Sequence, residues 1–99
     1  MNPSAQTRIL AVIEALAGHE VIGLRLKEVA EAVGGGSAAS TILRDLEALE
    51  SAGWAQKSRE GRWMLASRPI QVLHHFYAGL KTIESRAAEV AANYTKLPC

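Results

Sequence analysis

A cluster of basic side chains surrounds a Glu-Gly pair in the second half of the chain. The cluster contains Lys57, Arg59, Arg62 and Arg68, and Glu60 is the acidic residue among them. Ammonium and guanidinium groups bind phosphate oxygens through charge-assisted hydrogen bonds. A charged turn is most often simply solvated. This turn follows directly after a short helix, and that order favours a surface that binds a nucleic-acid backbone.

The predicted helix before this turn has one apolar side. Ile42, Leu46 and Leu49 recur at spacings of four and three, which indicates a buried stripe on a helix. Ser37 or Ser40 can cap the helix start, because a side-chain oxygen accepts a backbone N–H that the first turn leaves unpaired. The polar residues on the opposite side of this helix are then free to contact a ligand.

A glycine ends this helix and a hairpin follows it. Gly53 suits a helix C-terminus, and Trp54 can fold back on the last turn of the helix. Trp63 and Leu65 share one side of a strand, and Gly61 suits the tight turn before them. This order predicts a winged helix-turn-helix, a mainly α fold with a small β-hairpin wing.

Two further helices are predicted upstream. The first begins with Asn2, a capping residue that is followed by proline, and ends at Gly18. Its apolar stripe consists of Ile9, Val12, Ile13 and Leu16. Leu24 is predicted to form a short strand that pairs with the hairpin. A second helix covers residues 26–33, and the three glycines 34–36 form the turn into the third helix.

The C-terminal segment has a heptad pattern of apolar residues. Two domains are predicted, a winged helix-turn-helix over residues 1–67 and a helical arm over 68–99. Apolar residues of the arm alternate at spacings of three and four. They are Leu73, Phe76, Leu80, Ile83, Ala87, Val90, Tyr94 and Leu97. This repeat is typical of a coiled-coil seam, so we expect a homodimer through this helix, either parallel or antiparallel. The alternative is a helix that lies on its own domain.

No residue constellation predicts catalysis. The adjacent side chains of His74 and His75 diverge on a helix, and the single cysteine, Cys99, allows neither a disulfide framework nor a metal site. We therefore expect no enzyme activity, no metal and no cofactor. No apolar run reaches membrane-spanning length and no signal segment begins the chain, which predicts a cytoplasmic protein. The net charge of +1 gives no global basic field.

Several segments between residues 7 and 66 resemble the N-terminal domain of IclR-type transcriptional regulators. They are Arg8-Ile-Leu-Ala-Val-Ile-Glu-Ala-Leu, Leu24-Arg-Leu-Lys-Glu-Val-Ala-Glu-Ala-Val-Gly, Ser40-Thr-Ile-Leu-Arg-Asp-Leu-Glu-Ala-Leu-Glu, Gly53-Trp and Glu60-Gly-Arg-Trp-Met-Leu. The resemblance implies that the third helix enters the major groove of double-stranded DNA. The residues that would then face DNA are Ser37, Ala38, Ala39, Ser40, Thr41 and Arg44. Arg59 and Arg62 would lie on the wing.

The chain departs from the IclR pattern at two places. A single helix follows the first domain where IclR regulators carry a large effector-binding domain, so we expect no small-molecule effector. The second helix of the family begins with a serine or threonine cap, and Arg25 occupies that place here. Arg25 can reach a DNA phosphate near this helix start. The alternative, to which we give equal weight, is that the Arg25 side chain is simply solvated.

The sequence therefore predicts a homodimeric, sequence-specific transcriptional regulator. Arg44 is the expected reader of guanine, and Ser40 or Thr41 can bond to phosphate or base. Lys57 and the wing arginines would supply affinity for the backbone. Two half-sites about one helical turn apart follow from a two-fold dimer. The alternative is a winged-helix module that binds a protein and not DNA.

Overall fold

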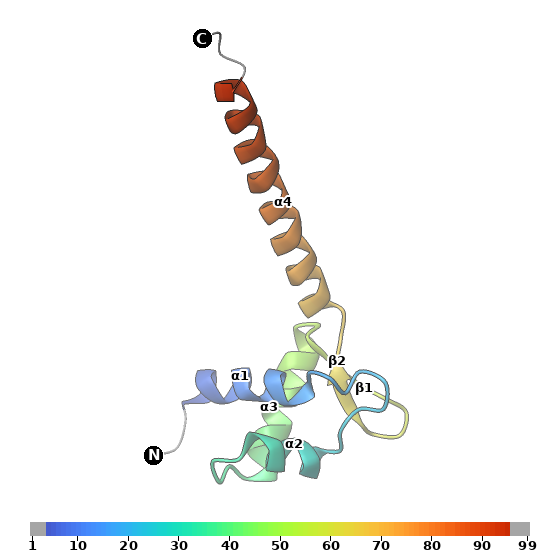
Figure 1. Cartoon of the computed structure of the whole chain (residues 1–99). Helices are drawn as coiled ribbons and strands as arrows, with labels where there is room; N and C mark the ends of the chain where they lie inside the picture. Colours follow the sequence, from blue (N-terminus) through green and yellow to red (C-terminus); the bar gives the residue numbers. More distant parts are fainter. Residues whose placement is uncertain (1–3, 96–99) are drawn as a thin grey trace. The chain divides into compact units, whose positions relative to one another are not determined.

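The computed structural model describes residues 4–95 of the chain (Figure 1). The elements follow in the order α1 (Ala5–Leu16), α2 (Leu26–Val33), α3 (Ala39–Ser51), β1 (Ala55–Lys57), β2 (Trp63–Leu65) and α4 (Arg68–Thr95). The described part is thus mainly helical, with one small antiparallel sheet of two strands. The chain divides into two compact units, Met1–Pro69 and Ile70–Cys99.

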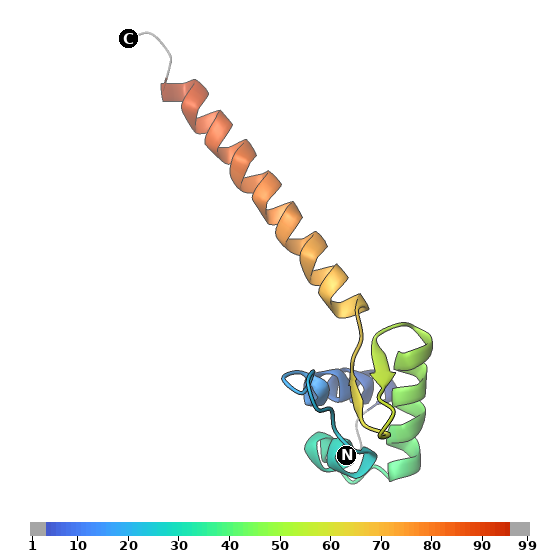
Figure 2. The same ribbon diagram turned by 90° about the vertical axis from the view of Figure 1, so that its right-hand side faces the viewer.

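The core of the first unit is built from the apolar stripes of its three helices and from the hairpin. Its buried residues are Val12, Leu16, Val29, Ile42, Leu46, Leu49, Ala55 and Trp63. Figures 1 and 2 both show α1 and α2 packed against α3, with the hairpin beside α3. The helical stripes predicted from the sequence are therefore confirmed, because burial of these side chains is the main force that holds short helices together.

Helix starts were predicted less well than helix interiors. The cap of α1 is Ser4, whose hydroxyl accepts the Thr7 N–H at 3.1 Å, and not Asn2, which lies outside the described residues. The cap position of α3 is Ala38, and no side chain caps this helix. The prediction that Ser37 or Ser40 caps it was wrong. Ser37 lies one residue before the cap position and Ser40 lies inside the first turn.

The end of α3 matches its prediction. Gly53 adopts a φ of +81°, which allows its N–H to bond to the carbonyl of Glu50 at 3.0 Å. The N–H of Trp54 then bonds to the carbonyl of Leu49 at 2.8 Å. This pair of bonds is the Schellman motif that glycine makes possible. The motif turns the chain directly into β1, so the hairpin is held close to the end of α3.

The hairpin turn has three residues and a bulge. Lys57 pairs with Trp63 at the inner end of the turn. The Ser58 N–H bonds to the carbonyl of Arg62 at 2.7 Å, and the Gly61 N–H bonds to the carbonyl of Ser58 at 3.0 Å. Gly61 has a φ of +79°, as the bulge position of such a turn requires. The Ser58 hydroxyl accepts the Arg62 N–H at 3.1 Å, so the bulge leaves no amide unpaired there.

A third short segment fastens the hairpin to the loop after α1. Leu24 forms an antiparallel bridge with Trp63, through N–H to carbonyl bonds of 2.8 Å and 2.7 Å in the two directions. The predicted pairing of Leu24 with the hairpin is confirmed. Gly23 makes this approach possible, because a Cβ there would lie 2.9 Å from the Trp63 carbonyl oxygen and 3.0 Å from the Cβ of Arg62.

The second unit consists, in its described part, of the helix α4 from Ile70 onward. The 28 residues of α4 span about 42 Å at 1.5 Å per residue. Pro69 lies in its first turn, where a missing N–H leaves no bond unmade. The predicted seam positions from Leu73 to Tyr94 lie on this helix, and Leu97 lies outside the described residues. Across residues 4–95, no helix is long and apolar enough to cross a membrane.

Candidate nucleic-acid interface

The two sides of α3 differ sharply in burial and polarity. Its buried side consists of Ile42, Asp45, Leu46 and Leu49. Its exposed side consists of Ser40, Arg44, Glu47, Ala48 and Ser51, and Ala39 and Glu50 are exposed beside this set. The exposed set recurs at helical spacing, so it forms one continuous stripe that no other element of the unit covers. This stripe is the part of α3 that is free to meet a ligand.

Asp45 is the charged residue on the buried side, and it is paired with Arg8 of α1. The Arg8 Nε donates to Asp45 Oδ2 at 2.5 Å and a terminal guanidinium nitrogen donates to Oδ1 at 3.0 Å. The hydrogen bond to Asp45 raises the pKa of Arg8 above its ordinary value, although burial acts in the opposite direction. A two-pronged bond of this kind has a fixed geometry, so it sets the rotation of α3 relative to α1.

This ion pair changes the charge that α3 presents to solvent. From the sequence, Asp45 counts with Glu47 and Glu50 as acidic residues of the helix. With Asp45 buried against Arg8, the exposed acidic residues of α3 are Glu47 and Glu50 alone. The outer face of the helix therefore repels a polyanion less than the sequence alone indicates.

The predicted DNA-facing residues gather at the start and on the outer side of α3. Ala38, Ala39, Ser40 and Arg44 are exposed, whereas Ser37 and Thr41 are half-buried. The first N–H groups of a helix have no acceptor within the helix. The Thr41 N–H already bonds to the Ala38 carbonyl at 3.0 Å. Since no side chain caps α3, the N–H groups of Ala39 and Ser40 are open to an outside acceptor, and a phosphate is the kind that a helix start favours.

The basic side chains of the hairpin differ in whether they already interact with other groups of the protein. Arg59 is exposed at the turn. The Lys57 ammonium lies 5.4 Å from the centre of the Trp63 ring, and Arg62 lies 3.7 Å from a carboxylate oxygen of Glu28 on α2. Arg68 was predicted to join this cluster, and that prediction was wrong. Arg68 begins α4 at the open end of the hairpin, where its N–H bonds to the Gly53 carbonyl at 3.3 Å.

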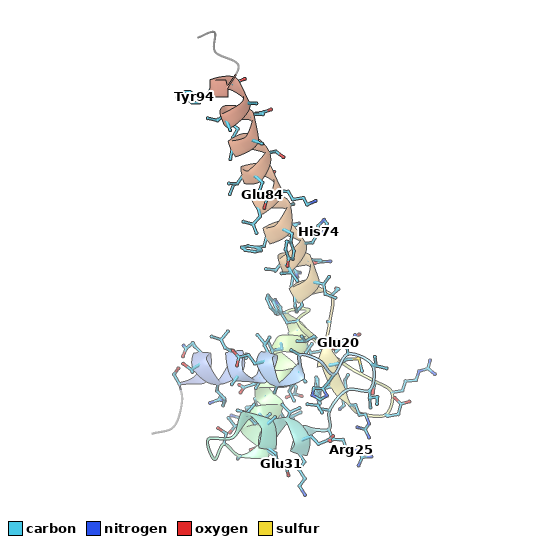
Figure 3. All side chains as sticks on the ribbon, in the orientation of Figure 1. Glu20, Arg25, Glu31, His74, Glu84 and Tyr94 are labelled. Carbon is cyan, nitrogen blue, oxygen red and sulfur yellow. The ribbon has the colours of Figure 1, made fainter. Side chains whose placement is uncertain are left out.

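Glu28 joins the start of α2 to the hairpin. Its carboxylate accepts the backbone N–H of Arg25 at 2.8 Å and pairs with Arg62. Arg25 occupies the cap position of α2 without a side-chain hydrogen bond to the helix, so Glu28 supplies part of the capping that a serine or threonine would provide. Figure 3 shows the Arg25 side chain at the foot of the hairpin. Glu28 therefore links the start of α2, where Arg25 lies, to Arg62 of the hairpin.

Sequence reasoning missed Arg8, Asp45 and Glu28 as positioning residues. Asp45 had a usable signal, since it lies three residues after Ile42 and four before Leu49, within the apolar stripe. A carboxylate on a buried face requires a partner. The pairing of Glu28 with Arg62 joins residues distant in sequence, and no spacing rule predicts it.

Comparisons with known proteins do not place the chain in a family. No family model matches it and no curated protein matches it. Within residues 4–95, no group of three or more His, Cys, Asp or Glu side chains could hold a metal ion. The contacts described above define the candidate site as the outer side of α3, the hairpin turn and the start of α2.

Proposed function

We propose that this chain is a winged-helix DNA-binding regulator. The observation that carries the proposal is the exposed stripe of α3, fixed in rotation by the pair between Arg8 and Asp45 and flanked by a basic hairpin. Such a helix can enter the major groove of B-DNA, and the hairpin then acts as a wing on the backbone. The resemblance to IclR-type domains supports the same assignment.

Different residues would supply specificity and affinity. Arg44 is the longest cationic side chain on the outer side of α3, and a guanidinium can bond to both acceptors of guanine in the major groove. Ser40 and Thr41 would bond to phosphate or base at the helix start. Lys57, Arg59, Arg62 and Arg25 would contact phosphates, which gives affinity without sequence preference.

The proposed regulator acts as a homodimer through α4. One head of this size makes few phosphate contacts, and affinity rises strongly when a second head is held beside it. The apolar seam of α4 supports this part of the proposal, since several of its large side chains are more than half exposed in the single chain, including Phe76 at 58% and Ile83 at 66%.

A second candidate function is a winged-helix module that binds another protein. The exposed carboxylates of Glu47 and Glu50 and the net charge of +1 favour this alternative. The two functions differ in their response to DNA. Absence of duplex binding at low salt would favour the protein-binding module.

Selection of bound duplexes from a random pool tests the DNA proposal, and three variants then assign the roles. Arg44→Ala should weaken binding to the selected duplex by about 1–3 kcal/mol and leave unrelated duplexes unaffected. Arg59→Gln should weaken all duplexes alike and reduce the salt slope by about 0.9 for each chain bound. Lys81→Gln removes a cation from α4 and should change neither quantity. An equal effect of Arg59→Gln and Lys81→Gln would refute the role of the hairpin.

A further inference from the structure

The apolar seam of α4 is uneven in the size of its side chains. Leu73, Phe76 and Leu80 fill its first half with large groups, and Phe76 is 58% exposed. The second half contains Ala87 at a seam position, between Ile83 and Val90. Where such a surface pairs with a copy of itself, a bulky aromatic side chain packs best opposite a small one.

The small side chain of Ala87 leaves a hollow on the helix. The hollow is shallow and widely open to solvent. It is lined by Ile83, Arg86, Ala87, Val90 and Ala91 and is almost entirely apolar. All five residues belong to α4, so nothing within this helix can fill the space. An apolar group from a second copy would cover this surface favourably.

We propose that two copies of α4 pair antiparallel, with Phe76 of each copy seated in the Ala87 hollow of the other. This inference rests on the proposed dimer and specifies its direction and register. In an antiparallel coiled coil, residues of the two seam types face each other. The register that places Leu80 opposite Ile83 of the second copy also places Phe76 opposite Ala87 and Leu73 opposite Val90.

The parallel arrangement matches these side chains poorly. Each seam residue then faces its own counterpart, since the two helices run in the same direction and in register. Phe76 would meet Phe76 and Tyr94 would meet Tyr94, while Ala87 would meet Ala87 and leave the hollow empty on both copies. Voids and crowding both destabilise packed interfaces, so this size pattern favours the antiparallel pair.

Charges beside the seam disfavour one neighbouring antiparallel register. A shift by one heptad, centred near Ser85, would set Glu84 opposite Glu84 and Arg86 opposite Arg86. Like charges at flanking positions oppose pairing. In the proposed register Glu84 lies opposite Tyr77 of the second copy, and Arg86 lies opposite Gly79. No pair of like charges then faces across the seam within the described helix.

The antiparallel register also sets the distance between the two helix starts. Arg68 of one copy lies opposite Thr95 of the other, so the two starts are about 40 Å apart along the axis. Adjacent half-sites on one face of B-DNA are about 34–36 Å apart. A parallel pair would instead bring the two starts to within the 8–10 Å of packed helices.

Disulfide crosslinking of the full chain tests the pairing. In a Cys99→Ser background, Leu73→Cys and Val90→Cys are made as separate variants. Mixed and oxidised, they should form a crosslinked dimer, because residues 73 and 90 face each other. Each variant alone should stay uncrosslinked, since equal residues are about 26 Å apart along the axis. Crosslinking of either variant alone, or its absence in the mixture, would overturn the proposal.

A swap of side-chain sizes provides a second test. Ala87→Phe alone fills the hollow and should weaken the dimer at least about tenfold in sedimentation equilibrium. Phe76→Ala combined with Ala87→Phe restores one large and one small group in each layer and should restore dimerisation. Failure of the double variant to recover would contradict the register. Crosslinking as expected with no duplex binding at low salt would refute the DNA function and leave the pairing intact.

Discussion

The contact of Gly23 with the hairpin yields a prediction whose magnitude follows from the structure. Gly23→Ala places a Cβ 2.9 Å from the Trp63 carbonyl oxygen, which is closer than carbon and oxygen atoms can approach. The φ of +82° adds a cost of about 1–2 kcal/mol for a residue with a Cβ. Relief of the overlap must lengthen the two bonds between Leu24 and Trp63, each worth about 0.5–1.5 kcal/mol. The expected loss of stability is about 2–5 kcal/mol.

Gly18→Ala is the matched control for this change. Gly18 has a φ of +89°, and no atom lies within 4 Å of a Cβ built there. It should therefore cost only the backbone term of about 1–2 kcal/mol. Urea unfolding of both variants, followed by tryptophan fluorescence, measures the difference. Equal losses for Gly18→Ala and Gly23→Ala would refute the inference that Leu24 and Gly23 hold the hairpin in place.

Three further predictions concern the core and its charges. Asp45→Asn should lower the urea midpoint because it leaves the Arg8 guanidinium without its anionic partner. Glu47→Gln, on the exposed side of α3, is the control and should leave the midpoint unchanged. Equal midpoints for the two variants would show that the buried pair is unimportant for stability. Trp63→Ala should cost about 3–5 kcal/mol, and a loss below about 1 kcal/mol in the same assay would contradict the central place of this ring in the core. The Glu20 carboxylate accepts backbone N–H groups, chiefly that of Gly18, which lowers its pKa. The stabilisation that this carboxylate gives the fold is complete above the ordinary pKa of a glutamate and is lost as the pH falls through the lowered pKa. Glu20→Gln should therefore reduce the pH dependence of the urea midpoint in that acidic range.

Much of the fold follows from periodicity in the sequence. The stripes of α1, α2 and α3 are visible because each helix must bury one side, and Gly53 marks the end of α3 because only glycine adopts its positive φ readily. The same reasoning failed at the start of α3. The three glycines before it all adopt positive φ, and their path places Ala38 at the cap position although serines lie on both sides.

The candidate site was less predictable than the fold, because it depends on contacts between distant residues. The pair of Asp45 with Arg8 removes a charge from the outer face of α3, and Glu28 draws Arg62 toward α2. Neither partner is fixed by local spacing. Arg68 is close to Arg62 in sequence, but the hairpin carries the two residues to opposite ends. The exposed stripe around Arg44 could be predicted, since it is the complement of the buried one.

Duplex binding across a range of salt concentrations tests the central proposal most directly. If the hairpin cations Lys57, Arg59 and Arg62 of both chains contact phosphates, these six contacts alone give a slope of log K against log salt of about −5, and Arg25 would steepen it further. Affinity should then fall by about a thousandfold between 50 and 200 mM salt. The result that would contradict the account is an absence of duplex binding at the lowest salt concentration, or a binding constant that does not change with salt.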